Sequence, residues 1–270
     1  MGRRLAASHL AGPAVGDAIR LAELFSGRGW SCAIGPWVSP DSTPRDNFSI
    51  YCLAIDAIVA RGLDGYLSIK LSTIGYDEGM FGELLARGRG ARVRIHCDSI
   101  GPESADPTMA MVGKAAAAHT NVGSTLPAGW RRSPTDALRL AEWGVAARIV
   151  KGQWSDPGGR VNDIRSCYVG LARTLAGKGI RVGIATHDRR VARESISLLV
   201  AAGTPCDMEQ LSGLPQNCAS IARSLGVPFR VYIPYGYPYL PYDIWQVRAR
   251  PAVAIWALRD FIAGKHRPVR

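Results

Sequence analysis

The sequence predicts a single α/β domain folded as a closed (β/α)8 barrel of the TIM type. Short apolar runs rich in β-branched residues alternate with longer helical segments along the whole chain. The starts of these runs lie about 24–35 residues apart, which is the span of one strand–loop–helix–loop unit. Eight such units joined by right-handed crossovers are the number that closes a parallel barrel.

Each expected strand corresponds to one short apolar run of the sequence. In chain order they are SCAIGPW (31–37), YLSIKLS (66–72), RVRIHCDS (92–99), VGSTLPA (122–128), ARIVKG (147–152), RVGIATHD (181–188), TPCDMEQL (204–211) and FRVYIPYG (229–236).

Two of the segments between these strands carry clear helix signals. PTDALRLAEWG opens on Pro134, a residue favoured in the first helical turn, and spaces Leu138, Leu140 and Trp143 along one side. VNDIRSCYVGLARTLAGKG reaches a stop at Gly177, because glycine commonly ends a helix.

Polar side chains stand at the point where several apolar runs stop. Chemistry in barrels of this kind gathers at the carboxyl ends of the strands. The pattern therefore marks one end of the barrel as the functional end, and the residues concerned are Lys70, His96, Asp98, Arg148, Lys151, Thr186, His187 and Tyr232.

Composition narrows the class of protein. The chain has 270 residues, 47% of them hydrophobic and 20% charged, which is ordinary for a globular domain. The most apolar stretch, Ile50–Ala60, is too short to span a bilayer and carries Asp56. Residues 1–18 lack the apolar core of a signal peptide, so we expect a cytoplasmic protein with one domain over 1–270.

The net charge of +11 is compatible with association with an anionic membrane surface or with a phosphate-bearing cofactor. It does not indicate nucleic-acid binding, because the arginines are spread along the chain and the one dense basic stretch is the tail at 263–270.

The six cysteines are scattered without a CxxC pair, which is typical of reduced thiols rather than of a disulfide framework or a zinc site. Cys32, Cys97 and Cys206 lie in or beside strand-like runs, where we expect them to be buried core residues. His96 and Asp98 share one face of their strand, but the sequence offers no third ligand, so no metal site is predicted.

Four strand motifs, LSIKLS, ARIVKG, GIATHD and FRVYIPYG, together resemble those of the proline dehydrogenase family. The segment PYDIWQVRARPAVAIW is similar to that family's last helix, and the resemblance covers about residues 15–262. It implies a (β/α)8 barrel that binds FAD and oxidises a cyclic secondary amine by passing hydride to the flavin.

The resemblance also implies roles for individual residues. Arg148 would lie beside the flavin near N5, Lys70 would stand over the active-site face, and Tyr232 would point into the pocket. The remaining cofactor contacts would come from Lys151 and Gly152 along the ribityl and phosphate region, and from Thr186, His187 and Asp188 on the adenosine and pyrophosphate side. GxGxxG does not follow the first strand, so a Rossmann-type site is not predicted.

This sequence departs from the family where the family holds its substrate. Trp245 and Gln246 occupy the positions of two arginines that clamp the substrate carboxylate, and Ala249 occupies that of an acid. Neither Trp nor Gln reproduces a guanidinium fork. Three further family positions differ: an aspartate falls at His96, a flavin-contacting glutamine at Pro127 and a tyrosine at Trp154.

These departures leave three functions open. The first is a flavoenzyme acting on an amine or imino compound other than free proline, with Trp154 and Trp245 lining a more apolar pocket and an electron acceptor that the sequence does not identify. The second is a flavin-free barrel that uses Lys70 or Lys151 as a Schiff-base nucleophile, activated by a nearby cation such as Arg148. The third is an inactive relative that binds a ligand or a partner protein.

Overall fold

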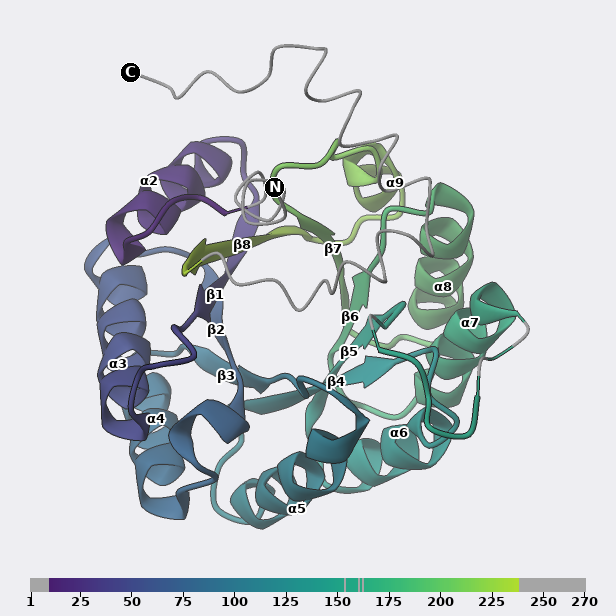
Figure 1. Cartoon of the computed structure of the whole chain (residues 1–270). Coiled ribbons are helices and arrows are strands. Elements are labelled where there is room, and N and C mark those ends of the chain that lie inside the picture. The colour runs from purple at the N-terminus through teal and green to yellow at the C-terminus, as the bar shows by residue number, and fades with distance from the viewer. Residues whose placement is uncertain (1–9, 153, 160, 162, 238–270) are drawn as a thin grey trace.

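Eight parallel strands close into a barrel in the order β1 to β8, and the predicted fold class is confirmed (Figure 1). The structure is a computed structural model, and it describes residues 10–152, 154–159, 161 and 163–237. The strands are β1 (Ser31–Trp37), β2 (Gly65–Ile69), β3 (Arg94–Cys97), β4 (Val122–Pro127), β5 (Ala146–Val150), β6 (Val182–Ala185), β7 (Cys206–Leu211) and β8 (Phe229–Gly236).

Helices surround the barrel as an outer ring (Figure 1). They are α2 (Val15–Ser26), α3 (Pro44–Ala60), α4 (Glu78–Gly90), α5 (Ala105–Ala116), α6 (Ser133–Glu142), α7 (Ile164–Leu175), α8 (Arg189–Ala201) and α9 (Ala219–Ser224), with short 3-10 turns at Leu71–Ile74 and Pro102–Ser104. Among the helices in the described ranges, none is both long and apolar enough to cross a membrane.

The barrel closes between its first and last strands with the help of the segment that precedes α2. β1 pairs with β8 from Ser31↔Arg230 to Trp37↔Gly236. Ala11 donates a backbone hydrogen bond to the Pro234 carbonyl at 2.8 Å. α2 then packs beside β8 and β1, so the closing seam is covered (Figure 1).

Two details of the sequence prediction are corrected. The strand expected over 66–72 ends at Ile69, because the chain turns into a 3-10 helix at Leu71. Leu138 does not share the buried side of α6 with Leu140, since it is 52% exposed whereas Leu140 is fully buried. The two residues are two positions apart and therefore lie about 200° apart around a helix.

The cysteines behave as the sequence indicates. All six are free, and Cys32, Cys97 and Cys206 are buried. Burial raises the pKa of Cys32 and of Cys206 to about 11, which keeps these thiols protonated at neutral pH.

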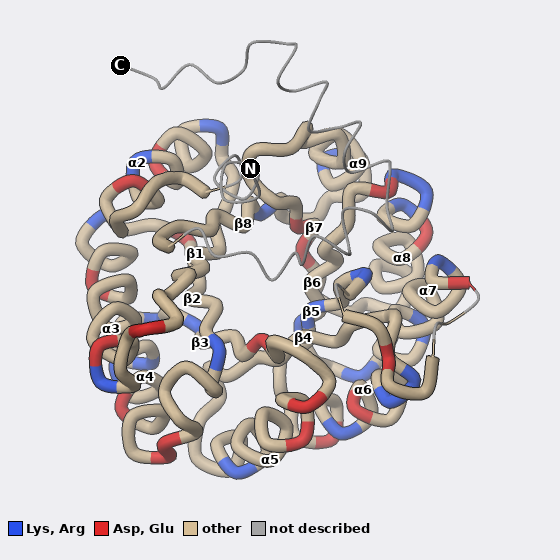
Figure 2. Tube along the Cα trace, in the orientation of Figure 1, with Lys and Arg blue, Asp and Glu red and all other residues tan. Residues whose placement is uncertain are grey.

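Aliphatic side chains of the strands face the helices, while the barrel interior is strongly polar. Leu67, Ile95 and Ile149 are fully buried in the shell between strands and helices. The alternate positions of the same strands carry charged and hydroxyl groups, and Figure 2 shows charged residues on the strands as well as on the outer helices. A barrel interior is usually filled by branched apolar residues, so this one is built for polar chemistry.

Candidate active site

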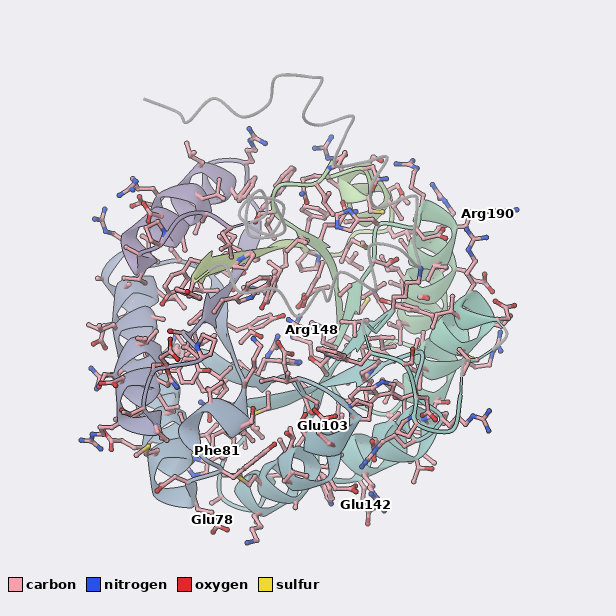
Figure 3. All side chains as sticks on the ribbon, viewed as in Figure 1. Glu78, Phe81, Glu103, Glu142, Arg148 and Arg190 are labelled. Carbon is pink, nitrogen blue, oxygen red and sulfur yellow. The ribbon has the colours of Figure 1, made fainter. Side chains whose placement is uncertain are left out.

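Arg148 is the centre of the polar interior. It lies in the middle of β5, its side chain is 8% exposed, and Figure 3 places it near the barrel axis. One of its terminal nitrogens, Nη2, lies 2.5 Å from Asp98 Oδ1, and the other, Nη1, donates to the Tyr66 hydroxyl at 2.9 Å. Its Nε is buried and has no acceptor among the described residues.

Asp98, just past the end of β3, is the carboxylate that holds Arg148. It also accepts hydrogen bonds from the hydroxyls of Ser68 on β2 and Thr125 on β4, the latter at 2.5 Å. Burial alone would raise its pKa, but the positive charges of Arg148 and then Lys70 outweigh burial and lower it to about 2. Asp98 is therefore an ionised anchor for the cation and not a proton acceptor at neutral pH.

Tyr232 also packs against the guanidinium. Its ring centroid is 5.1 Å from Arg148 Cζ, a cation–π distance. Its hydroxyl reaches across β1 at Gly35, where an added Cβ would stand 2.2 Å from the phenol oxygen. Tyr232 therefore points into the barrel, and the absence of a side chain at position 35 makes room for it.

A Gly35→Ala variant tests this placement. The new methyl group must displace Tyr232 or the strand, and overpacking of this kind costs about 1–3 kcal/mol. Urea denaturation should show that loss, whereas Gly82→Ala in α4, where a Cβ meets nothing within 4 Å, should be neutral or stabilising. Equal stability of the two variants would contradict the position given to Tyr232.

Lys70 and His96 belong to the same cluster. The charge of Lys70 acts on Asp98 and on Tyr51, whose hydroxyl accepts from the Lys70 backbone N–H at 3.3 Å. His96 Nε2 lies 3.1 Å from Thr125 Oγ1. Burial, reinforced by the charge of Arg148, holds the pKa of His96 well below its usual value, so the ring is neutral.

This cluster bears on the Schiff-base function left open by the sequence. The Schiff-base hypothesis invoked a second cation beside the lysine, and in the structure Lys70 and Arg148 both act on the Asp98 carboxylate and lower its pKa. No group of three His, Cys, Asp or Glu side chains in the described part of the chain could hold a metal ion.

The expected cofactor residues follow β5 and β6, which are neighbours. Because Val150 pairs with Ala185, Lys151 and Gly152 leave the barrel beside Thr186 and His187. Lys151 is exposed. Gly152 has a φ of +89°, and a Cβ there would stand 2.9 Å from Pro127 Cβ.

The polar groups after β6 have partners within the protein. Asp188 caps α8 by accepting from the backbone N–H groups of Arg190 and Val191 and pairs with Arg165 at 2.8 Å. His187 Nε2 accepts from the Leu211 N–H at 3.2 Å. These contacts give both residues a structural explanation, and a cofactor contact at either stays a prediction.

Only some of the residues expected in the substrate pocket lie in the described part of the chain. Trp154, in the loop after β5, accepts a hydrogen bond at its carbonyl from Trp130 Nε1 at 3.0 Å, which ties this loop to the one after β4. Trp245 and Gln246, like the rest of the segment resembling the last helix, lie outside the described residues.

Two residues of the cluster, Tyr66 and Glu209, were missed by the sequence analysis, and Asp98 was placed at the functional end of the barrel without a role in the site. The available signal was the alternation along each strand, which places Asp98 on the same face as His96, and Tyr66 on the same face as Lys70. Glu209 is fully buried in β7 and accepts from the Tyr66 hydroxyl at 2.8 Å.

The residues present partly fit a bound flavin. The buried Nε of Arg148 is a donor that meets no acceptor within the described ranges. The positive φ of Gly152, just past the end of the same strand, allows close backbone approach by a ligand. Pro127, however, has no side-chain donor and packs directly on Gly152, so any hold on a flavin would come from the β5 and β6 ends rather than from β4.

Comparison with known proteins gives similarity in sequence and in fold. The chain is 26% identical over 230 residues to a proline dehydrogenase of Deinococcus radiodurans, covering 78% of this chain and 74% of that protein. It is 24% identical over 225 residues to proline dehydrogenase 1 of Bacillus subtilis subsp. natto, covering 77% and 74%. No protein-family model matches the sequence.

Two solved structures share the fold. The first is proline utilization A from Bdellovibrio bacteriovorus inactivated by N-propargylglycine, with a TM-score of 0.78 at 14% identity. The second is a variant of proline utilization A from Bradyrhizobium japonicum, with a TM-score of 0.69 at 16% identity. Each match covers 95% of this chain, which spans 32% and 30% of those longer chains. The chain thus resembles the proline dehydrogenases as a divergent relative.

Proposed function

We propose that this chain is a proline-dehydrogenase-like flavoenzyme that binds FAD and oxidises a CH–NH group of an amine or imino compound. The observation that carries the proposal is the buried Arg148 guanidinium, which is fixed on Asp98 just past the end of β3 and whose Nε meets no acceptor in the described part of the chain. Similarity to proline dehydrogenases in sequence supports the same reaction class.

The chain's own residues would contribute positioning and charge. FAD, when bound, supplies the acceptor for the hydride. Arg148 would offer a fixed positive charge to the reduced ring, and such preorganised charge stabilises added electron density without reorganisation. Lys70, whose charge acts on Asp98, and Tyr232, which packs on Arg148, would line the same space.

The substrate we propose is not free proline. Trp245 and Gln246 stand in the sequence where the family has its two arginines, and Trp154 lies in the loop after β5. Such a pocket suits an amine whose carboxylate is absent, masked or tethered to a carrier.

A visible absorption spectrum of the purified protein tests the proposal directly. Flavin bands, either as purified or after addition of FAD and removal of the excess, are the expected result. A protein that stays colourless after FAD addition would refute the proposal and favour a flavin-free function.

Arg148→Ala should weaken FAD binding about tenfold to a hundredfold, because one charge-assisted hydrogen bond is worth roughly 1.5–3 kcal/mol. Arg148→Lys, which keeps a positive charge for Asp98, should lose less. Arg193→Ala, an exposed arginine of α8, is the matched control and should bind FAD as the wild type does. Unchanged affinity in Arg148→Ala, measured by fluorescence titration, would count against the assignment.

A further inference from the structure

Arg148 is held from two directions, and only one of them is the Asp98 carboxylate at the mouth. On the other side Nη1 donates to the Tyr66 hydroxyl, which in turn donates to Glu209 Oε2 at 2.8 Å. Arg148 Nη1 itself lies 4.0 Å from the same oxygen, beyond hydrogen-bond distance. The Tyr66 hydroxyl therefore bridges the cation to a second, deeper carboxylate.

The bridge has a defined polarity because Tyr66 stays protonated. Burial raises the pKa of Tyr66 far above its usual value, and the charge of Arg148 offsets only part of that rise. The phenol proton is thus available to Glu209, and the phenol oxygen is available to Arg148. One hydroxyl satisfies both neighbours, and removing it leaves both without that partner.

Glu209 is placed by the strand beside it. Its Oε1 lies over β6 at Gly183, where an added Cβ would stand 2.6 Å from this oxygen and 3.4 Å from Arg148 Cγ. Oε1 is buried and meets no hydrogen-bond donor among the described residues. Burial raises the pKa of Glu209, while Arg148 and Arg230 act in the opposite direction. A costly buried carboxyl group is therefore kept 4.0 Å from the site's cation.

Tyr66 is itself held by three side chains that pack around its ring. Arg94 Cζ lies 4.6 Å and Arg230 Cζ 5.2 Å from its centroid, and the His96 ring is 5.3 Å away. The hydroxyl cannot follow a displaced guanidinium without moving these neighbours. The packing around Tyr66 therefore restricts the position of the Arg148 guanidinium.

We propose that Tyr66 and Glu209 are positioning residues that set the orientation of the Arg148 guanidinium, and through it the affinity and reduction potential of the flavin. The flavin part rests on the proposed function. The positioning part concerns only side chains of this chain and holds with or without a cofactor.

A double-mutant cycle with Tyr66→Phe and Glu209→Ala is the test. If the two residues act through one chain of contacts, each single variant should raise the FAD dissociation constant about tenfold. The dissociation constant of the double variant should then be no higher than that of the single variant with the lower affinity. Glu209→Gln, whose side-chain oxygen still accepts from Tyr66, should recover most of the affinity. Effects that simply multiply in the double variant would overturn the proposal.

A reduction potential separates positioning from a loss of packing. A displaced cation stabilises the reduced flavin less than a correctly placed cation does. The midpoint reduction potential should therefore fall by about 30 mV for each tenfold change in the ratio of the affinities for reduced and oxidised flavin. Tyr168→Phe is the matched control, because Tyr168 is also buried and donates to the Ile149 carbonyl at 2.6 Å from the outer side of β5. It should leave the potential unchanged, and an equal fall in this control would refute positioning.

If the wild type takes up no flavin, the proposed function fails, but the positioning of Arg148 by Tyr66 and Glu209 can still be tested. The same cycle is then measured as shifts of the urea midpoint in the flavin-free protein. Non-additive shifts for Tyr66→Phe and Glu209→Ala support the bridge, and additive shifts overturn it.

Discussion

Asp98→Ala is expected to destabilise the fold by about 3–5 kcal/mol, the usual cost of removing one partner from a buried ion pair. The variant leaves Arg148 charged and 8% exposed, with Nη2 deprived of its carboxylate. Ser68 and Thr125 lose their acceptor at the same time. Chemical denaturation measures the loss directly.

The matched control is Asp106→Ala. Asp106 also pairs with an arginine, Arg132, at 2.6 Å, but its side chain is 87% exposed. Exposed pairs are worth about 0–1 kcal/mol, so this variant should stay close to the wild type. A similar small loss for Asp98→Ala would mean that the buried pair does not anchor Arg148.

Lowering the pH should remove the stabilisation that the same ion pair contributes. The pKa of Asp98 is lowered from 3.8 to about 2, so its contribution is present above pH 4 and is lost as the pH falls from about 4 to about 2. A shift of this size corresponds to roughly 2 kcal/mol. Asp98→Asn should be less stable than the wild type at neutral pH and should lack this part of the acid dependence.

The strands could be predicted because each is encoded by a local pattern. Eight apolar runs at the spacing of one strand–helix unit each overlap one of the eight observed strands, and the closed topology follows from their number. The polar residues at the strand ends could be predicted for the same reason. Lys70, His96, Arg148 and Tyr232 do meet in one cluster.

The partners within the barrel could not be predicted, because they depend on which strands face each other across its axis. Tyr66 and Glu209 are 143 residues apart, and Arg148 and Asp98 are 50 apart. Alternation along a strand gives the face of a side chain but not its partner. A buried acid such as Glu209 also breaks the expectation that charged residues are exposed, as functional interiors often do.

Free L-proline should be oxidised with a kcat/KM at least about a hundredfold below that of a dedicated proline dehydrogenase. Trp245 and Gln246 stand at the positions of the family's two arginines, and Ala249 at that of its acid. A substrate carboxylate entering such a pocket is desolvated without a fork of donors, which costs at least a few kcal/mol. Each 1.4 kcal/mol is about tenfold in rate.

The measurement is proline oxidation with an artificial electron acceptor, comparing the wild type with the double variant Trp245→Arg, Gln246→Arg. The double variant should gain activity chiefly through a lower KM, because restored guanidinium groups bind the carboxylate in ground and transition state alike. The low activity expected of the wild type requires that neither Lys70 nor Arg248 already receives the carboxylate. Arg248→Gln in the wild-type background therefore serves as the control and should leave the residual activity unchanged. Wild-type turnover near the enzyme median of about 10 s⁻¹ would contradict the proposal, because it would mean that another group holds the carboxylate.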